Sequence, residues 1–414
     1  MNVPGPRSKS LFPDLQLFES RNVTFVDDEF PVFWDSASGS TVVDVDGNRF
    51  TDLTSAFGVA GTGHSNPRVA EAVAQQSRRL MHAMGDVHPT AIKSDLMKKL
   101  AALAPGRANK VFLATTGSDA VEAAMKTAVI ATGRSAFVSF EGAYHGLSLG
   151  ALEVCGIDKF RYPFRDLLPT NNIFLPFPQQ RADIGDLRAL LRSRNDIAGV
   201  IVEPIQGRGG CRIPPEGYLS DLQAECTSAG TLFILDEIYT GFGRTGDMFA
   251  AEFEEVQPDI MCVGKALGNG FPISAIVARA SVMDTWPATR GEALHTSTSL
   301  GNPMGCAAAL ANIDEIERLK LPERARSLGE RLGTRLQRLR AHPNVLDIRG
   351  RGLMWGIEMR DAACAVKAVR GALRRGVIVL QAGPSGNVLS VTPPLIIEHD
   401  ELSSAITVIE ECLA

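Results

Sequence analysis

Short apolar runs alternate with longer mixed segments through the middle of the chain. Each run is rich in Val, Ile, Leu, Ala and Phe, a composition typical of strands that are buried on both faces. The segments between the runs have the length and composition of helices, and this alternation predicts a mostly parallel sheet flanked by helices. The predicted strands are residues 111–114, 136–140, 199–202, 232–235, 260–263 and 275–278.

The two ends of the chain carry weaker patterns. The first forty residues are predicted to be irregular, and the alternation over residues 42–46, broken by Asp46-Gly47, indicates a hairpin. Elsewhere we expect helices at residues 68–81, 304–319, 323–340 and 401–412, and strands at 345–348, 352–359 and 377–380. The sequence therefore predicts an α/β protein with a large sheet domain at 61–310. A smaller α+β domain would combine residues 1–60 with 311–414.

Composition narrows the class of protein. The net charge is −5, from 42 basic and 47 acidic residues, and no block of like charge indicates binding to nucleic acid or to a membrane surface. No apolar run approaches the roughly 20 residues of a membrane helix, and the N-terminus does not resemble a signal peptide. The seven cysteines lack paired spacing, which favours a reducing compartment. We expect a soluble cytoplasmic protein.

Two neighbouring strands are predicted to deliver an acid and a lysine to one place. Asp236 ends the run at 232–235, and Lys265 follows the run at 260–263. Chemistry in parallel α/β sheets gathers outside the carboxyl ends of the strands. Pyridoxal phosphate needs a lysine for its Schiff base and a carboxylate that keeps the pyridine nitrogen protonated. The alternative, for these two residues alone, is a buried ion pair that only joins two strands.

The surrounding segments resemble the signature of a known family. Residues 236–246 read Asp-Glu-Ile-Tyr-Thr-Gly-Phe-Gly-Arg-Thr-Gly, and residues 264–272 read Gly-Lys-Ala-Leu-Gly-Asn-Gly-Phe-Pro. Both are similar to the class III aminotransferases, the pyridoxal-phosphate enzymes that include ornithine, acetylornithine and 4-aminobutyrate aminotransferases. The resemblance extends from about Thr41 to Pro394 and covers nearly the whole chain.

This resemblance implies the fold-type I architecture and a homodimer whose two active sites are shared between subunits. It implies a two-stage amino transfer from an amine or amino acid to a keto or aldehyde acceptor. Lys265 would form the Schiff base and shuttle the proton, while Asp236 would hold the pyridinium. A racemase or aminomutase on the same fold would use the same residues, and a catalytically silent cofactor-binding protein is a further alternative.

Two segments are candidates for the cofactor phosphate. Residues 115–124 leave a strand and open a helix, so Gly117 and Ser118 would present free N–H groups at a helix N-terminus. An ordinary capped helix explains these residues equally well, but the resemblance assigns them, with Thr116, to the phosphate. It also selects Thr298, just before Gly301-Asn302-Pro303, as a phosphate ligand supplied by the neighbouring subunit. Thr296 and Ser297 are close enough to compete for this role, and a helix-capping turn is the other alternative.

Further site residues follow from the same resemblance. Tyr144 would stack on one face of the pyridine ring and Ile238 would cover the other, with His145 beside them. Glu203 ends a predicted buried strand, where an acid is costly unless it is paired or solvated, and the resemblance places it near the cofactor. Plain core packing for Tyr144 and His145, and a solvated strand end for Glu203, are the alternatives.

Arg208 and Ser390 depart from the family pattern. Many members carry Glu at the first position, and those that handle α-amino acids carry Arg at the second. In that pattern the Arg binds the α-carboxylate of glutamate, and the Glu masks the Arg for other substrates. Because both residues are replaced here, we predict that Arg208 anchors a carboxylate or polar substrate. A solvated loop arginine is the alternative.

Two other features do not indicate sites. The segment 241–246, Gly-Phe-Gly-Arg-Thr-Gly, lacks the strand and helix context and the downstream acid of a dinucleotide-binding loop. His82 and His88 are not accompanied by a cluster of Cys or carboxylate ligands, so no metal site is predicted.

Overall fold

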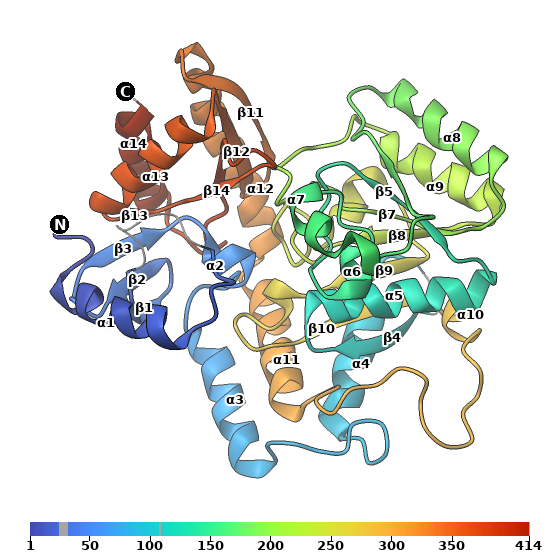
Figure 1. The fold of residues 1–414 in the computed structure, drawn as a ribbon. Coiled ribbons are helices and arrows are strands. Elements are labelled where there is room, and N and C mark those ends of the chain that lie inside the picture. Colours follow the sequence, from blue (N-terminus) through green and yellow to red (C-terminus); the bar gives the residue numbers. More distant parts are fainter. Residues whose placement is uncertain (25–31, 107–108, 414) are drawn as a thin grey trace.

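The structure is a computed structural model of the chain and describes residues 1–24, 32–106 and 109–413. Within this part of the chain, the largest sheet has seven strands in the order β4-β10-β9-β8-β7-β5-β6 (Figure 1). The strands from β6 to β9 run parallel, and β10 is antiparallel to both β9 and β4. The strands are β4 (Asn109–Ala114), β5 (Ala136–Phe140), β6 (Ile173–Leu175), β7 (Ile197–Val202), β8 (Leu232–Asp236), β9 (Ile260–Val263) and β10 (Ser274–Arg279).

The predicted mostly parallel sheet is confirmed, since every one of the six predicted runs forms a strand. Strand β6 was not predicted, because three half-buried residues at the sheet edge give no extended apolar run. Side chains of β8 alternate between the two faces, as the strand geometry requires. Ile234 packs in the cluster that includes α5 (Gly117–Thr132), whereas Phe233 and Leu235 pack in the cluster that includes α9 (Tyr218–Ala229).

A second sheet joins the two ends of the chain. It has the order β1-β2-β3-β13, with the C-terminal strand β13 (Val377–Ile378) parallel to β3 (Arg49–Asp52). Strands β1 (Trp34–Ser38) and β2 (Thr41–Asp44) complete it, so the predicted hairpin is present. Figure 1 shows these N-terminal elements beside the C-terminal helices α13 (Ala362–Arg374) and α14 (His399–Leu413).

The prediction that the first forty residues are irregular was wrong, because helix α1 (Pro6–Phe18) and strand β1 lie within them. A tertiary contact holds the start of α1: the Asp46 carboxylate accepts from the N–H groups of Arg7 and Ser8 and from the Ser8 hydroxyl. The apolar run Phe30-Pro31-Val32-Phe33-Trp34 of this segment lies partly outside the described residues.

The third sheet has the order β11-β12-β15-β14. Its strands are β11 (Val345–Arg351), β12 (Met354–Met359), β14 (Leu380–Ala382) and β15 (Val388–Val391). The single strand predicted at 377–380 was wrong, because the chain passes from the second sheet at β13 to the third at β14. Local sequence does not distinguish one bent strand from two strands in different sheets.

Helices complete the layers around these sheets. Helices α11 (Pro303–Arg318) and α12 (Leu321–Gln337) occupy the two stretches predicted as helical after Pro303, and α3 (Pro67–Arg79) packs on α11. No described helix is both long and apolar enough to cross a bilayer. The remaining helices are α2 (Ser55–Gly58), α4 (Ala91–Leu103), α6 (Leu149–Leu152), α7 (Asp158–Arg161), α8 (Ile184–Ser193) and α10 (Ala280–Met283). The 3-10 helices are Tyr162–Leu167, Arg181–Asp183, Ala250–Glu254, Lys265–Leu267 and Arg338–Ala341.

Candidate active site

The carboxyl ends of three parallel strands deliver charged side chains to one cavity. Asp236 ends β8, Glu203 directly follows β7, and Lys265 lies two residues after β9. All three line a cavity of about 180 Å³. The predicted convergence of Asp236 and Lys265 is therefore present in the structure, because parallel neighbours place equivalent ends at the same sheet edge. The other lining residues are Gly117, Ser118, Tyr144, His145, Gly146, Ile238 and Tyr239.

Asp236 is held by two contacts. Its Oδ2 lies 2.7 Å from Nδ1 of His145, and its Oδ1 accepts from the N–H of Ile238 at 3.0 Å. Both the Asp236 and the His145 side chains are buried. His145 Nε2 is also buried and has no hydrogen-bond partner among the described residues. The Asp236 carboxylate is therefore held at the cavity wall by the His145 ring and the Ile238 N–H.

Lys265 begins a short 3-10 helix in the left-handed backbone region, at φ +41°. Its Nζ lies 4.2 Å from the ring centroid of Tyr239. Burial lowers the pKa of the Lys265 ammonium, while the nearby Asp236 and Glu203 carboxylates oppose that shift. A lysine of lowered pKa is neutral, and so nucleophilic, in a larger fraction of molecules at neutral pH.

Glu203 is held by the backbone on both carboxylate oxygens. Oε1 accepts from the N–H of Tyr144 at 2.9 Å, and Oε2 accepts from the N–H of Gly207 at 3.0 Å. Burial raises the pKa of the Glu203 carboxyl to about 7, and the neighbouring Asp236 adds to the shift. The alternative of a solvated strand end is wrong, because only 5% of Glu203 is exposed.

The N-terminus of α5 forms a cradle of small residues. Thr116 caps the helix, and its side chain accepts from the N–H of Asp119. Gly117 and Ser118 line the cavity beyond this cap. A Cβ added at Gly117 would lie 3.0 Å from the Ile238 side chain, and one added at Gly146 would lie 2.1 Å from Ser118 Oγ. Free N–H groups at the start of this 16-residue helix favour an anion there.

Thr298 is not among the residues that line this cavity and lies on an exposed turn before α11. Its segment is tied to residues 81–86. Thr296 Oγ1 donates to the Asp86 carboxylate at 2.9 Å, and Asn302 Nδ2 donates to the Met81 carbonyl at 3.1 Å. The single chain does not bring Thr298 to Lys265, and its predicted role across a subunit interface stays a prediction.

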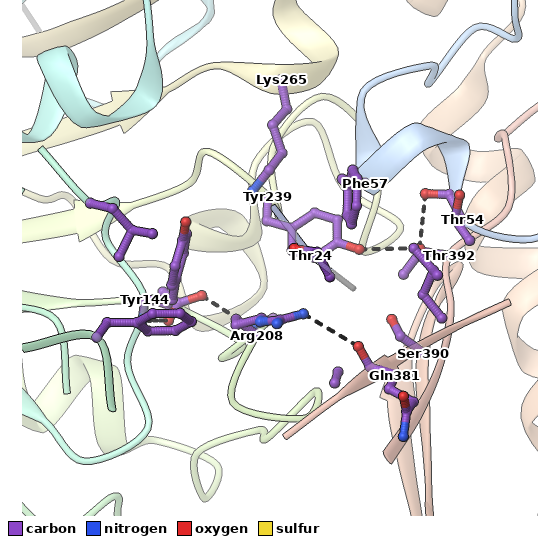
Figure 2. A pocket seen from close by; sticks show the side chains of 16 residues that line it. Thr24, Thr54, Phe57, Tyr144, Arg208, Tyr239, Lys265, Gln381, Ser390 and Thr392 are labelled. Carbon is purple, nitrogen blue, oxygen red and sulfur yellow. Dashed lines mark hydrogen bonds between the residues drawn. The ribbon is translucent and has the colours of Figure 1, made fainter. Parts of the chain in front are cut away.

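A larger cavity, of about 370 Å³, adjoins the first and shares Lys265, Glu203, Tyr144 and Tyr239 with it. Figure 2 shows the Arg208 side chain extending through it toward Gln381, with Ser390 and Thr392 on the same wall. Sequence analysis missed several lining residues. These are Thr24, Thr54, Phe57, Leu147, Phe160, Gly207, Tyr239, Leu380, Gln381, Ala382 and Thr392. The position of Tyr239 within the 236–246 motif was the one local signal for any of them.

Comparison with known proteins decides which family this site belongs to. The model of the family described as "Aminotransferase class-III" matches residues 24–413. The chain belongs to the class-III aminotransferase family. It is 40% identical to an acetylornithine aminotransferase of Methanothermobacter thermautotrophicus, over 92% of this chain and 93% of that protein. It is 38% identical to a putrescine aminotransferase of Pectobacterium atrosepticum, over 92% of this chain and 82% of that protein.

Solved structures agree with this class-III assignment. The ornithine aminotransferase of Toxoplasma gondii, crystallised with partial occupancy of PLP at its active site, superposes with a TM-score of 0.90 at 29% identity and covers 99% of this chain and 96% of that one. The predictions of fold-type I, of aminotransferase activity and of pyridoxal phosphate as cofactor are confirmed. The named relatives are all aminotransferases, so the racemase, aminomutase and silent-protein alternatives lack support.

The residues of this class-III site fit the cofactor chemically. Gly117, Ser118 and Gly146 line the cavity at the N-terminus of α5, where free N–H groups would suit a phosphate. Asp236 offers a carboxylate to a protonated ring nitrogen, and Tyr144 and Ile238 both line the cavity next to it. Lys265 supplies the amine. The cavity therefore holds a residue of suitable chemistry for a phosphate group, for a ring nitrogen and for a carbonyl carbon.

Proposed function

We propose that Lys265 is the residue that carries the cofactor covalently and then moves the proton in both halves of the amino-transfer cycle. The convergence of Lys265, Asp236 and Glu203 on one cavity carries this proposal. When bound, pyridoxal phosphate supplies an electron sink for the carbon that bears the amino group. The lowered pKa of Lys265 keeps its Nζ available as nucleophile and as base.

Asp236 is proposed to hold the ring nitrogen, with His145 as the residue that positions it. The buried contact between His145 and Asp236 supports this, because it fixes the carboxylate direction without solvent. Tyr144 and Ile238 would cover the two ring faces. Glu203 would lie beside the ring as the second acid of the site, its two oxygens already held by backbone N–H groups.

The cofactor phosphate is proposed to bind Gly117, Ser118 and Thr116 of one subunit and Thr298 of the other. This requires a homodimer. Exposed apolar side chains lie on the two segments that the Thr296–Asp86 hydrogen bond joins, as an interface between copies would require. They are Met81, Met84, Val87 and Leu294. All seven cysteines are free, which supports a cytoplasmic location.

Borohydride reduction followed by peptide mapping tests the role of Lys265. The pyridoxyl mass should lie on Lys265, and Lys265→Ala protein should bind the cofactor without the absorbance of the lysine-bound form and should lose turnover. Lys126, which lies next to His295 outside the cavity, provides the comparison. Labelling of Lys126 in place of Lys265 would overturn the assignment.

Ultracentrifugation of Met84→Glu protein tests the shared site. A charge in the proposed interface should shift the protein toward monomer and weaken cofactor binding in the same titration, because the monomer lacks the partner's Thr298. Leu346→Glu is the control, since Leu346 is equally exposed on β11 but lies outside these segments. A Met84→Glu monomer with unchanged cofactor affinity would contradict the proposal.

A further inference from the structure

The larger cavity is positively charged away from the cofactor site. Among its described lining residues, the side chains of ordinary acidic or basic character are Glu203, Arg208 and Lys265. In the proposed function Lys265 binds the cofactor. Both Glu203 carboxylate oxygens accept hydrogen bonds from backbone N–H groups. The Glu203 pKa of about 7 also leaves its carboxyl partly protonated at neutral pH. Arg208 therefore sets the charge of the outer part of the cavity.

The backbone around Arg208 is fixed by contacts on both sides. The Arg208 carbonyl accepts from the N–H of Gly383 at 2.9 Å, which joins this loop to the end of β14. Gly207 donates to Glu203, and a Cβ added at Gly207 would lie 2.2 Å from the Tyr239 ring. The loop therefore has little freedom, and the guanidinium is presented to the cavity from a constant position.

The Arg208 guanidinium has five N–H donors but little to bond within the described chain. Its one described side-chain hydrogen bond is from Nη1 to the Gln381 carbonyl, at a long 3.4 Å. It forms no described ion pair, although Arg349 beside the same loop donates to the Asp347 and Glu358 carboxylates. The Arg208 guanidinium is half-buried and has no carboxylate partner among the described residues, so it is suited to bind the carboxylate of a substrate.

The rest of the cavity wall is largely apolar, and its polar side chains, such as Thr54, Gln381 and Thr392, are uncharged. Phe57, Leu147, Phe160 and Leu380 line the space together with Arg208. Ser390, which faces the same space from β15, is polar but uncharged. A short hydrocarbon segment would therefore find apolar contacts between Lys265 and the guanidinium. A cationic end group of a substrate would be repelled by the Arg208 guanidinium, because no acidic side chain among the described residues in this part of the cavity offsets the repulsion.

We propose that this aminotransferase selects substrates in which a short apolar spacer separates the reacting amine or carbonyl from a carboxylate bound by Arg208. Diamines of the same length are rejected by the same residue. This inference rests on the proposed function, since it uses Lys265 to define where the reacting end lies. It names a substrate class, the ω-amino carboxylates and the corresponding oxo acids.

Matched substrate pairs test this selection in the cofactor-loaded enzyme. The pairs are 3-aminopropanoate with 1,3-diaminopropane, 4-aminobutanoate with 1,4-diaminobutane, and 5-aminopentanoate with 1,5-diaminopentane. The loss of the lysine-bound cofactor absorbance gives the second-order rate constant for each compound. In at least one pair the amino acid should react ~10-fold faster or more, which corresponds to about 1.4 kcal/mol. No preference, or a preference for the diamine in every pair, would overturn the inference.

Variants then attribute the preference to Arg208. Arg208→Gln should lower the rate constant of the preferred amino acid ~10-fold or more while changing that of the diamine by less than about 3-fold. Arg208→Glu should favour the diamine. Arg212→Gln is the control, since Arg212 lies on the same loop but not in the cavity lining. Equal losses for both compounds of a pair in Arg208→Gln would contradict a selective role.

A binding measurement keeps the inference separate from the proposed function. Calorimetry of the wild-type holoenzyme with pentanoate and with butyltrimethylammonium needs no turnover, because neither compound can react with the lysine-bound cofactor. Pentanoate should bind ~10-fold tighter or more. Weaker or equal binding of pentanoate would overturn the role of Arg208 even where the variants fail to fold. If no amine discharges the lysine-bound absorbance while pentanoate binds, the amino-transfer role of Lys265 fails and the carboxylate site stands.

Discussion

His145 Nδ1 and Asp236 Oδ2 lie 2.7 Å apart, and both side chains are buried at the end of β8. His145→Ala would leave Asp236 with the Ile238 N–H as its described hydrogen-bond donor. A buried hydrogen bond to a charged group contributes about 1.5–3 kcal/mol. We therefore expect the cofactor dissociation constant to rise ~10-fold or more, as measured by fluorescence titration. His399→Ala, at an exposed helix start, should leave it unchanged; equal affinity of the two variants would exclude a positioning role for His145.

Gly146 and Gly133 form a matched pair of glycines with positive φ. Gly146, at φ +117°, has no room for a side chain because a Cβ would lie 2.1 Å from Ser118 Oγ. For Gly133, at φ +67°, no atom of the described residues lies within 4 Å of an added Cβ. Gly133→Ala should lose about 1 kcal/mol of stability through backbone strain, and Gly146→Ala should lose more because its Cβ also collides with Ser118. Only Gly146→Ala should also weaken cofactor binding, because it displaces Ser118; similar cofactor affinities in both variants would count against the cradle.

Arg244 is 2% exposed and connects three distant segments. Its Nη1 donates to the carbonyls of Leu353 and Pro393, and its Nη2 donates to Ser55 Oγ. Arg244→Met would leave these buried acceptors without their donor, at about 1–3 kcal/mol for each unsatisfied group. We expect a lower urea midpoint that corresponds to ~3 kcal/mol or more.

Arg326→Met is the control for Arg244. Arg326 is largely exposed and pairs with Asp247, and exposed pairs contribute less than about 1 kcal/mol. A small effect of Arg244→Met, comparable with that of the control, would show that solvent or a rearranged side chain replaces the lost donor.

Glu237 gives the folded protein a pH-dependent stability. Its side chain is fully buried, accepts from the Ala251 N–H and from the Thr240 hydroxyl, and its pKa is raised by burial to about 7. Between the ordinary value of 4.5 and 7, the folded protein binds more protons than the unfolded chain. Its stability therefore falls as pH rises through this window. The contribution of the protonated Glu237 carboxyl to the free energy of unfolding is fully present below pH 4.5 and is lost above pH 7.

Glu237→Gln tests this contribution, because glutamine resembles the protonated acid and can donate to the Thr240 oxygen. The variant should be more stable than the wild type at pH 8, by up to about 3 kcal/mol, and close to it at pH 5. Urea unfolding at both pH values measures the difference. Glu203 has the same sign of shift, so part of the slope should remain. The control variant Glu330→Gln, at an exposed position, should leave the free energy of unfolding unchanged at both pH values. If the stability of Glu237→Gln depends on pH as steeply as that of the wild type, the burial argument is contradicted.

The sheet was predictable because its strands are nearly continuous apolar runs. Strand β7 is buried along its whole length, so no polar position interrupts the pattern. Strand β6 and helix α1 were not predictable in the same way. The first has three half-buried residues, and the second is held at its start by Asp46, 38 or more positions away. Local sequence does not encode such contacts.

The fold class and the family follow from the sequence alone, through its apolar runs and its motifs at residues 236–246 and 264–272. The meeting of Asp236, Glu203 and Lys265 also follows from it, because parallel strands bring their carboxyl ends to one edge. The wall of the larger cavity depends on the tertiary structure. Phe57, Gln381 and Ser390 come from opposite ends of the chain, and Arg208 meets them only after Gly383 joins its loop to β14. Strand position follows from local burial patterns, whereas this wall depends on which distant segments pack together.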